Sequence, residues 1–270
     1  MEKLTVRRKK INDEGQSRCR LRLRLRIRIL KGNSIERKKI YKWAQYGGNV
    51  AKTKIEWVKN PITGEQGYTI NPIVGCKNSC PYCYAKRMND RFHFVKKWDE
   101  PEHQEGWSNK LDKIKKPSII FMGSMTDLFG EWVPSGEIYN ILFDCGHFPE
   151  HRFLFLTKNP KRYNEFKGKF PFNCWRGATI SNNTGGIPLD IDFVSVEPLT
   201  DPKQLLQAEL TDAKWIIVGG MTPKSCHENY WLEPTIFNCK KGKRALFLKG
   251  NLHYPKVIQQ FPKELKGGGR

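Results

Sequence analysis

Short apolar runs alternate with amphipathic stretches along most of the chain. Continuously apolar runs of strand length predict buried strands, and stretches with an apolar residue every three or four positions predict helices. The predicted strands are Ser118–Gly123, Arg152–Thr157, Gly177–Ser181, Phe193–Glu197, Trp215–Gly219 and Ala245–Lys249, and a shorter apolar run at Ile70–Val74 precedes them. The predicted helices are Tyr84–Lys97, Pro134–His147, Pro202–Leu210 and Trp231–Cys239.

Strands and helices that alternate in this way predict an α/β fold. Because the strands are apolar throughout, we expect a parallel sheet that is buried on both faces. Such sheets carry ligand chemistry at the carboxyl ends of their strands. Polar residues follow the predicted strands at these positions: Cys76, Ser124, Asp127, Lys158, Asn182, Glu197, Gly219, Gly220 and Lys249.

One connection in this pattern is unusually short. Only Asn182–Asp192 separates the predicted strands Gly177–Ser181 and Phe193–Glu197, which is at the lower limit for a parallel crossover that includes a helix. Gly185, Gly186 and Pro188 make a helix there still less favourable. We therefore expect the sheet or barrel to be imperfect between these two strands.

Three cysteines carry the strongest chemical signal. Cys76, Cys80 and Cys83 have the spacing C-x3-C-x2-C on a predicted loop, where three thiolates can converge on one centre. A closed zinc site requires four ligands and a [4Fe–4S] cluster normally takes four cysteines, so three cysteines leave one iron open to a small molecule. The other cysteines are single, and we expect Cys145 and Cys174 to be buried as small hydrophobic residues.

Two other interpretations of the three cysteines remain. Zinc could recruit His93 or His103 as a fourth ligand, although neither has the short Cys–His spacing of zinc modules. A disulfide with one spare thiol is disfavoured in a reducing cytoplasm. No apolar run is long enough to span a bilayer, so we expect a soluble cytoplasmic protein without a membrane span.

Charge is concentrated at the start of the chain. The 270 residues include 48 Lys and Arg against 27 Asp and Glu, a net charge of +21, of which +12 belongs to residues 1–50. Arg20–Leu30 alternates arginine with aliphatic residues and could lie on phosphates or an anionic membrane as a strand. We favour a basic, low-complexity, poorly ordered extension over residues 1–52, followed by a domain over residues 53–270.

Six motifs occur in a fixed order along the chain: Thr53–Trp57, Cys76–Ala85, Gly123–Phe129, Leu156–Pro160, Ser195–Leu199 and Ile216–Gly220. In this order they resemble a phage-associated three-Cys-motif family of radical S-adenosylmethionine (SAM)-like proteins. The resemblance covers roughly residues 53–255, and this family is distantly similar to spore photoproduct lyase.

The resemblance implies a partial (βα) barrel, a [4Fe–4S] cluster on Cys76, Cys80 and Cys83, and SAM bound to the open iron. It implies reductive cleavage of SAM to a 5′-deoxyadenosyl radical, and an electron donor of the flavodoxin or ferredoxin type. No substrate follows from it. The other residues that it suggests for cofactor binding are Tyr82 near the adenine, Ser124 and Asp127 at the SAM amino end, Ser181 or Asn182 at the ribose or carboxylate, and Glu197 and Lys249 at cofactor or substrate.

A second function stays open: a basic nucleic-acid-binding module without catalytic activity, whose cysteines hold zinc. Basic and aromatic residues are interleaved in Lys86–Phe94, which fits phosphate contact with base stacking. The same stretch fits a helix that packs Met88, Phe92 and Val95 on the core, which we favour. The family commonly has an acidic residue where this chain has Met221. Nucleic acid and a separate partner protein remain candidate partners.

Overall fold

The computed structural model describes residues 50–181, 190–222 and 226–266. The predicted basic extension, residues 1–52, lies outside the described residues except for its last three positions. Asn182 also lies outside them. The unit that begins at Val50 is described below by itself.

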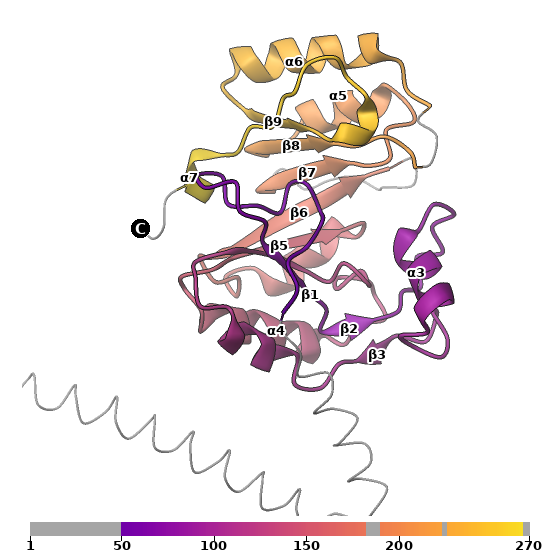
Figure 1. Cartoon of the computed structure of the whole chain (residues 1–270), viewed down its shortest axis with the longest axis vertical. Coiled ribbons are helices and arrows are strands. Elements are labelled where there is room, and N and C mark those ends of the chain that lie inside the picture. The colour runs from indigo at the N-terminus through magenta and orange to yellow at the C-terminus, as the bar shows by residue number, and fades with distance from the viewer. Residues whose placement is uncertain (1–49, 182–189, 223–225, 267–270) are drawn as a thin grey trace, which may run out of the picture. The chain divides into compact units, whose positions relative to one another are not determined.

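A seven-stranded parallel sheet forms the centre of the described chain, as the apolar runs predicted (Figure 1). The strand order is β1-β4-β5-β6-β7-β8-β9, with β2 and β3 in a separate two-stranded sheet. Each strand of the large sheet thus pairs with the next strand of that sheet along the chain, and the order never reverses. The strands are β1 (Tyr68–Ile70), β4 (Ile119–Met122), β5 (Arg152–Thr157), β6 (Cys174–Ile180), β7 (Phe193–Val196), β8 (Trp215–Val218) and β9 (Ala245–Leu248).

Helices cover one face of this sheet. Because parallel crossovers are right-handed and the strand order never reverses, successive crossover helices fall on the same side. The larger hydrophobic core lies between the sheet and these helices, and joins Ile120 and Val194 of the sheet to Leu142 and Leu205 of the helices. The longer helices on this side are α4 (Ser135–Gly146), α5 (Lys203–Glu209) and α6 (Leu232–Lys241).

Shorter elements complete the described fold. A fourth α-helix, α3 (Tyr84–Phe92), follows the cysteine loop, and a short helix, α7 (Lys263–Lys266), comes last. Among the described residues, no helix has the length and apolar character needed to cross a membrane. Longer 3₁₀ helices lie at Trp107–Lys113 and Pro160–Phe166, and single 3₁₀ turns lie at Asn229–Trp231 and Gly250–Leu252.

Aromatic side chains fill the other face of the sheet. The Trp57 ring lies 5.0 Å from Phe121 on β4, 6.0 Å from Phe193 on β7 and 6.1 Å from Trp215 on β8, measured between ring centroids. All four residues are buried in one cluster. The predicted burial of both faces of the sheet is therefore confirmed.

The segment around Trp57 links the two edge strands of the sheet. Near β1, the Thr53 amide donates to the Gly67 carbonyl at 2.9 Å. Near β9, the Gly250 amide donates to the Glu56 carboxylate at 2.9 Å, and the Lys59 ammonium donates to Gln259 at 2.7 Å. This segment thus crosses the aromatic face from one edge toward the other (Figure 1).

The short run Ile70–Val74 is divided between two sheets. Ile70 ends β1, whereas β2 (Ile73–Val74) pairs antiparallel with β3 (Glu102–His103). Pro72 lies between them and has no amide hydrogen to continue the parallel ladder. Its carbonyl instead accepts from the Gln104 amide at 2.7 Å, beside the antiparallel pair.

Helix α3 is shorter than predicted, and its packing differs from the prediction. The helix ends at Phe92 because His93 adopts a left-handed conformation, with φ of 53°. Val95 is buried, but Met88 and Phe92 are exposed. The prediction that all three residues pack on the core was therefore wrong: the buried side chains of the helix are Ala85 and Asn89.

The connection between β6 and β7 contains no helix in its described part, which is Ser181 and residues 190–192. The Arg176 guanidinium on β6 makes a bidentate ion pair with Asp190, with both N–O distances at 2.9 Å. The Arg176 amide also donates to the Asp192 carboxylate at 2.7 Å. The end of this short connection is thus fixed to the strand that precedes it.

The close approach of β6 and β7 generates a testable prediction. A Cβ at Gly177 on β6 would overlap the Phe193 ring on β7, whereas a Cβ at Gly136 in α4 would meet nothing within 4 Å. We expect Gly177→Ala to lower the free energy of unfolding by about 1–3 kcal/mol through overpacking. The matched Gly136→Ala should raise it by about 0.4–1 kcal/mol. Urea unfolding measures both, and equal effects would contradict the prediction.

Candidate site at the carboxyl edge of the sheet

Predicted site residues lie at the carboxyl ends of the strands. Ser124 and Asp127 follow β4, Lys158 follows β5, Glu197 follows β7 and Lys249 follows β9. Because the strands are parallel, these positions share one edge of the sheet. Ser181 is buried directly after β6, at the same edge.

The cysteine loop runs from the end of β2 to the start of α3. At its start, the Gly75 amide donates to the Met125 carbonyl at 3.0 Å, which fixes the loop to the segment after β4. At its end, the Cys83 sulfur caps α3 by accepting from the Lys86 amide at 3.3 Å. All three cysteines, Cys76, Cys80 and Cys83, are free and partly buried.

The surroundings of the loop shift the acidity of two of these thiols. Burial raises the pKa of Cys76 to about 11, and the Asp127 carboxylate adds to this while nearby backbone amides oppose it. Burial also raises the pKa of Cys80, and the positive charge of Lys158 opposes that rise. Metal ligation requires thiolates, so Lys158 favours the ligating form of Cys80.

Asp127 connects three segments at this edge. Its carboxylate is buried, with 5% of the residue exposed, and accepts four hydrogen bonds. From the end of β5, the Thr157 hydroxyl donates at 2.6 Å and the Lys158 amide at 2.9 Å. The Phe129 amide donates at 3.1 Å, and the Asn78 side chain of the cysteine loop at 3.0 Å. Asp127 thus holds the cysteine loop beside the ends of β4 and β5.

Tyr82 and Lys158 are in direct contact. The Lys158 ammonium nitrogen lies 3.3 Å from the Tyr82 hydroxyl oxygen and 5.5 Å from the centroid of its ring. The residue just before the third cysteine is thereby held against the end of β5. The sequence placed Lys158 at this edge, but its contact with Tyr82 could not be read from spacing.

Asn71 is a site residue that the sequence analysis missed. Its side-chain oxygen accepts from the Ser124 hydroxyl at 3.2 Å and from the Met125 amide at 3.1 Å. The Ser124 carbonyl in turn accepts from the Tyr84 hydroxyl at 2.8 Å. Desolvation of that hydroxyl raises the pKa of Tyr84 to about 12. An asparagine directly after an apolar strand was the only available signal.

Glu197 after β7 and Lys249 after β9 form an ion pair across the end of β8, the strand between them. The pair lies over Gly219, where an added Cβ would come within 2.9 Å of both side chains. The negative charge of Glu197 is also the smallest contributor to the raised pKa of Tyr84, after burial. Glycine after β8 therefore leaves room for this ion pair.

The turn after β8 is fixed by a second asparagine that the sequence analysis missed. The Asn251 side chain accepts from the Gly220 amide at 3.0 Å and donates to the Gly220 carbonyl at 2.8 Å. Met221 follows this turn directly and is partly buried.

Cysteine thiolates are the usual ligands of iron–sulfur clusters. The loop offers three free thiols, and the Asp127 oxygens beside them are already occupied by four donors. Within the described ranges, however, no three Cys, His, Asp or Glu side chains are gathered closely enough to hold a metal ion. His93 and His103 are both exposed and join no such group. The structure thus places three free cysteines on one loop without gathering their sulfur atoms.

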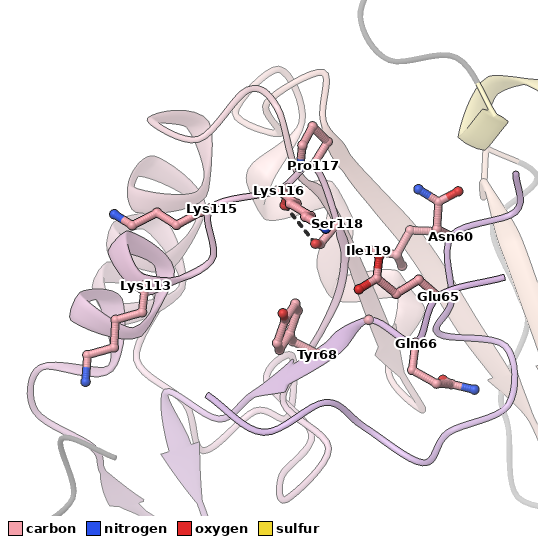
Figure 2. A pocket seen from close by; sticks show the side chains of 11 residues that line it. Asn60, Glu65, Gln66, Tyr68, Lys113, Lys115, Lys116, Pro117, Ser118 and Ile119 are labelled. Atoms are coloured by element: carbon pink, nitrogen blue, oxygen red, sulfur yellow. Dashed lines mark hydrogen bonds between the residues drawn. The ribbon is translucent and has the colours of Figure 1, made fainter. Parts of the chain in front are cut away.

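A pocket of about 270 Å³ lies at the opposite, amino edge of the sheet. Tyr68 at the start of β1 and Ile119 at the start of β4 line it, together with Glu65 and a lysine-rich turn. Figure 2 shows that the Lys113 and Lys115 side chains point away from Tyr68. The pocket lies at the edge of the sheet opposite the candidate site and is therefore separate from the cysteine loop.

Fold and site define an α/β protein with a three-thiol loop at the carboxyl edge of a parallel sheet. The chain belongs to the family described as "Protein of unknown function (DUF5131)", whose model matches residues 52–267. No curated protein matches the chain. Among solved structures, it is similar to a spore photoproduct lyase mutant with bound AdoMet and dinucleoside spore photoproduct. That match has a TM-score of 0.41 and 12% identity, and covers 86% of this chain and 77% of the other.

The hydrogen bonds of Asp127 generate a second prediction. We expect Asp127→Asn to lower the free energy of unfolding by at least about 2 kcal/mol. An NH2 group, which cannot accept a hydrogen bond, replaces one of the two oxygens that accept buried hydrogen bonds. Asn78→Ala removes a single bond from an exposed partner and should cost less than about 1 kcal/mol. Denaturant unfolding compares the two. A smaller effect at Asp127 than at Asn78 would show that the carboxylate does not organise this edge.

Proposed function

We propose that this chain is a radical SAM-type iron–sulfur protein of the three-Cys-motif kind, built on a partial (βα) barrel. The observation that carries the proposal is the loop of three free, partly buried cysteines, held at the carboxyl edge of a parallel sheet. Three thiol ligands suit a [4Fe–4S] cluster with one open iron better than a closed four-ligand zinc site. The substrate is not part of this proposal.

In this proposal, Cys76, Cys80 and Cys83 are the metal ligands. Lys158 supplies positive charge beside Cys80 and orients Tyr82, whose ring would face the adenine of SAM. Asp127 acts mainly through position, because its oxygens are occupied by protein donors. When bound, the reduced cluster would supply the electron that cleaves a carbon–sulfur bond of SAM, and a flavodoxin- or ferredoxin-like donor would supply that electron to the protein.

The remaining candidates would bind SAM or substrate. Ser124 is held by Asn71 at the end of β4 and would meet the amino end of SAM. Ser181 lies at the end of β6, where the ribose or carboxylate is expected, and Asn182 would share this role. The ion pair of Glu197 and Lys249 presents both charges at one edge and would orient a zwitterionic or hydrogen-bonding group.

Anaerobic reconstitution with iron and sulfide tests the cluster. We expect about four irons per chain and a broad charge-transfer absorption. Cys80→Ala should abolish both, because two thiolates do not hold the cluster. Cys226→Ala removes an exposed cysteine outside the loop and serves as the matched control, with iron content unchanged. Stoichiometric zinc without iron after anaerobic preparation would overturn the proposal and favour the zinc module.

Product analysis tests the reaction. Incubation of the reconstituted chain with SAM and a strong reductant should release 5′-deoxyadenosine and methionine, detected by liquid chromatography and mass spectrometry. Tyr82→Leu should lower this yield while iron content is retained, because it removes the ring beside Lys158 and leaves the three cysteines. A cluster-loaded protein that forms no 5′-deoxyadenosine would contradict the catalytic part of the proposal.

A further inference from the structure

Helix α3 and the loop after it present a row of exposed apolar side chains. Tyr84, Met88 and Phe92 are spaced four residues apart, which places them on one face of the helix. They are 48%, 39% and 55% exposed, and Phe94 beyond the helix is 50% exposed. At a rise of about 1.5 Å per residue, Tyr84 to Phe92 alone spans about 12 Å. We call Tyr84, Met88, Phe92 and Phe94, three aromatic residues and one methionine, the aromatic row.

The local fold directs this row outward. Ala85 and Val95 are buried with Val74 and Met125 in a small separate cluster, and they occupy the inner side of α3 and its loop. The Asn89 side chain accepts from the Val95 amide at 2.9 Å and donates to the Val95 carbonyl at 3.3 Å. These bonds turn the chain back at the end of the helix. Phe94 consequently lies beside Phe92, with ring centroids 5.8 Å apart.

Positive charge surrounds the aromatic row. Residues 84–97 contain five Lys and Arg against one acidic residue, Asp90. Arg87 and Arg91 directly precede Met88 and Phe92, so they flank the row on the helix. The Arg91 guanidinium carbon lies 5.1 Å from the centroid of the Phe92 ring. Exposed aromatic rings and flanking cations thus occur on one surface.

We propose that the aromatic row binds single-stranded nucleic acid. Unpaired bases stack on exposed aromatic and guanidinium planes, while Lys and Arg contact the phosphates between them. A duplex keeps its bases stacked internally and offers no free faces to such a row. A purely acidic protein partner would pair with the cations but leave the aromatic rings without a matching group. Base stacking together with phosphate contact uses both features.

The aromatic row is continuous with the candidate site. Cys83 caps the first turn of α3, and the Tyr84 hydroxyl donates to the Ser124 carbonyl at the end of β4. In Figure 1, α3 stands beside β2 at the margin of the described domain. A strand bound along the row would therefore reach the start of α3, where the cysteine loop ends at Cys83. As an assignment of substrate class, the inference rests on the proposed function, but binding itself requires neither cluster nor SAM.

Photo-crosslinking of the full chain locates the bound strand. The probe is a single-stranded oligonucleotide of about 16 nucleotides, the upper size of such sites, with 5-iodouracil at several positions. Irradiation is carried out on metal-free protein in the presence of a chelator, and crosslinked peptides are identified by mass spectrometry. We expect crosslinks within residues 84–94. Iron content after separate reconstitution reports the cluster, so failure of the two proposals is distinguishable.

Variants measure the contribution of stacking. Phe92→Ala combined with Phe94→Ala should weaken oligonucleotide binding at least about tenfold and remove the crosslink, without loss of folding since both rings are exposed. Phe172→Ala is the matched control: this ring is also exposed and has an Arg152 guanidinium at 5.9 Å, but it lies before the amino end of β6. We expect it to change affinity less than about twofold. Arg87→Gln should lower the salt-dependence slope by about 0.7 if it contacts one phosphate.

Three results would overturn the inference. Crosslinks confined to residues 1–49 would assign binding to the basic extension. Unchanged affinity and crosslinking in the double variant would show that the aromatic row takes no part. Displacement by polyglutamate as effective as displacement by unlabelled oligonucleotide of equal charge would show that the surface recognises charge alone, as an acidic protein partner would require.

Discussion

The arrangement of the carboxyl edge depends on one buried carboxylate. Asp127 takes hydrogen bonds from the end of β5, from its own turn after β4 and from the cysteine loop. A buried carboxylate is tolerated only when its oxygens are well supplied with donors, and here the donors come from three separate segments. The need to satisfy this charge therefore brings the segments together. Without it, nothing else among these contacts would join Asn78 to Thr157.

The sheet supplies the second constraint. Because the parallel strands follow one another in sequence, the crossover helices lie on one face of the sheet and the aromatic cluster lies on the other. The segments that leave the strands all begin at the carboxyl edge. Ser124, Asp127, Lys158, Glu197 and Lys249 meet there because each directly follows its strand. The amino edge has a pocket with lysines in its lining, and the Lys113 and Lys115 side chains point away from Tyr68 (Figure 2). The candidate site residues thus lie at the carboxyl edge of the sheet, away from the pocket at its amino edge.

Most strands were predictable because strands buried on both faces are apolar throughout, which leaves a signal in sequence. The division of the run Ile70–Val74 between two sheets could not be predicted, because apolar character does not reveal that Pro72 ends one ladder. Periodicity correctly grouped Met88 with Phe92, but it cannot say whether a helical face meets the core or solvent. In α3 the buried face carries Ala85 and Asn89, so Met88 and Phe92 lie on the exposed face. Asn71 and Asn251 escaped notice because each holds a turn far along the chain, and such pairing depends on the completed fold.

The segment around Trp57 has a consequence for the order in which the protein folds. Trp57 packs against Phe121 and Phe193, and also against Trp215, which follows it by more than half of the chain. During synthesis the aromatic face of the sheet must stay open until β8 and β9 have emerged, since contacts this distant in sequence form late. The helix-covered face can assemble one βα unit at a time. One face of the sheet can thus be covered unit by unit, whereas the aromatic cluster on the other face is complete only when Trp57 can also reach Trp215.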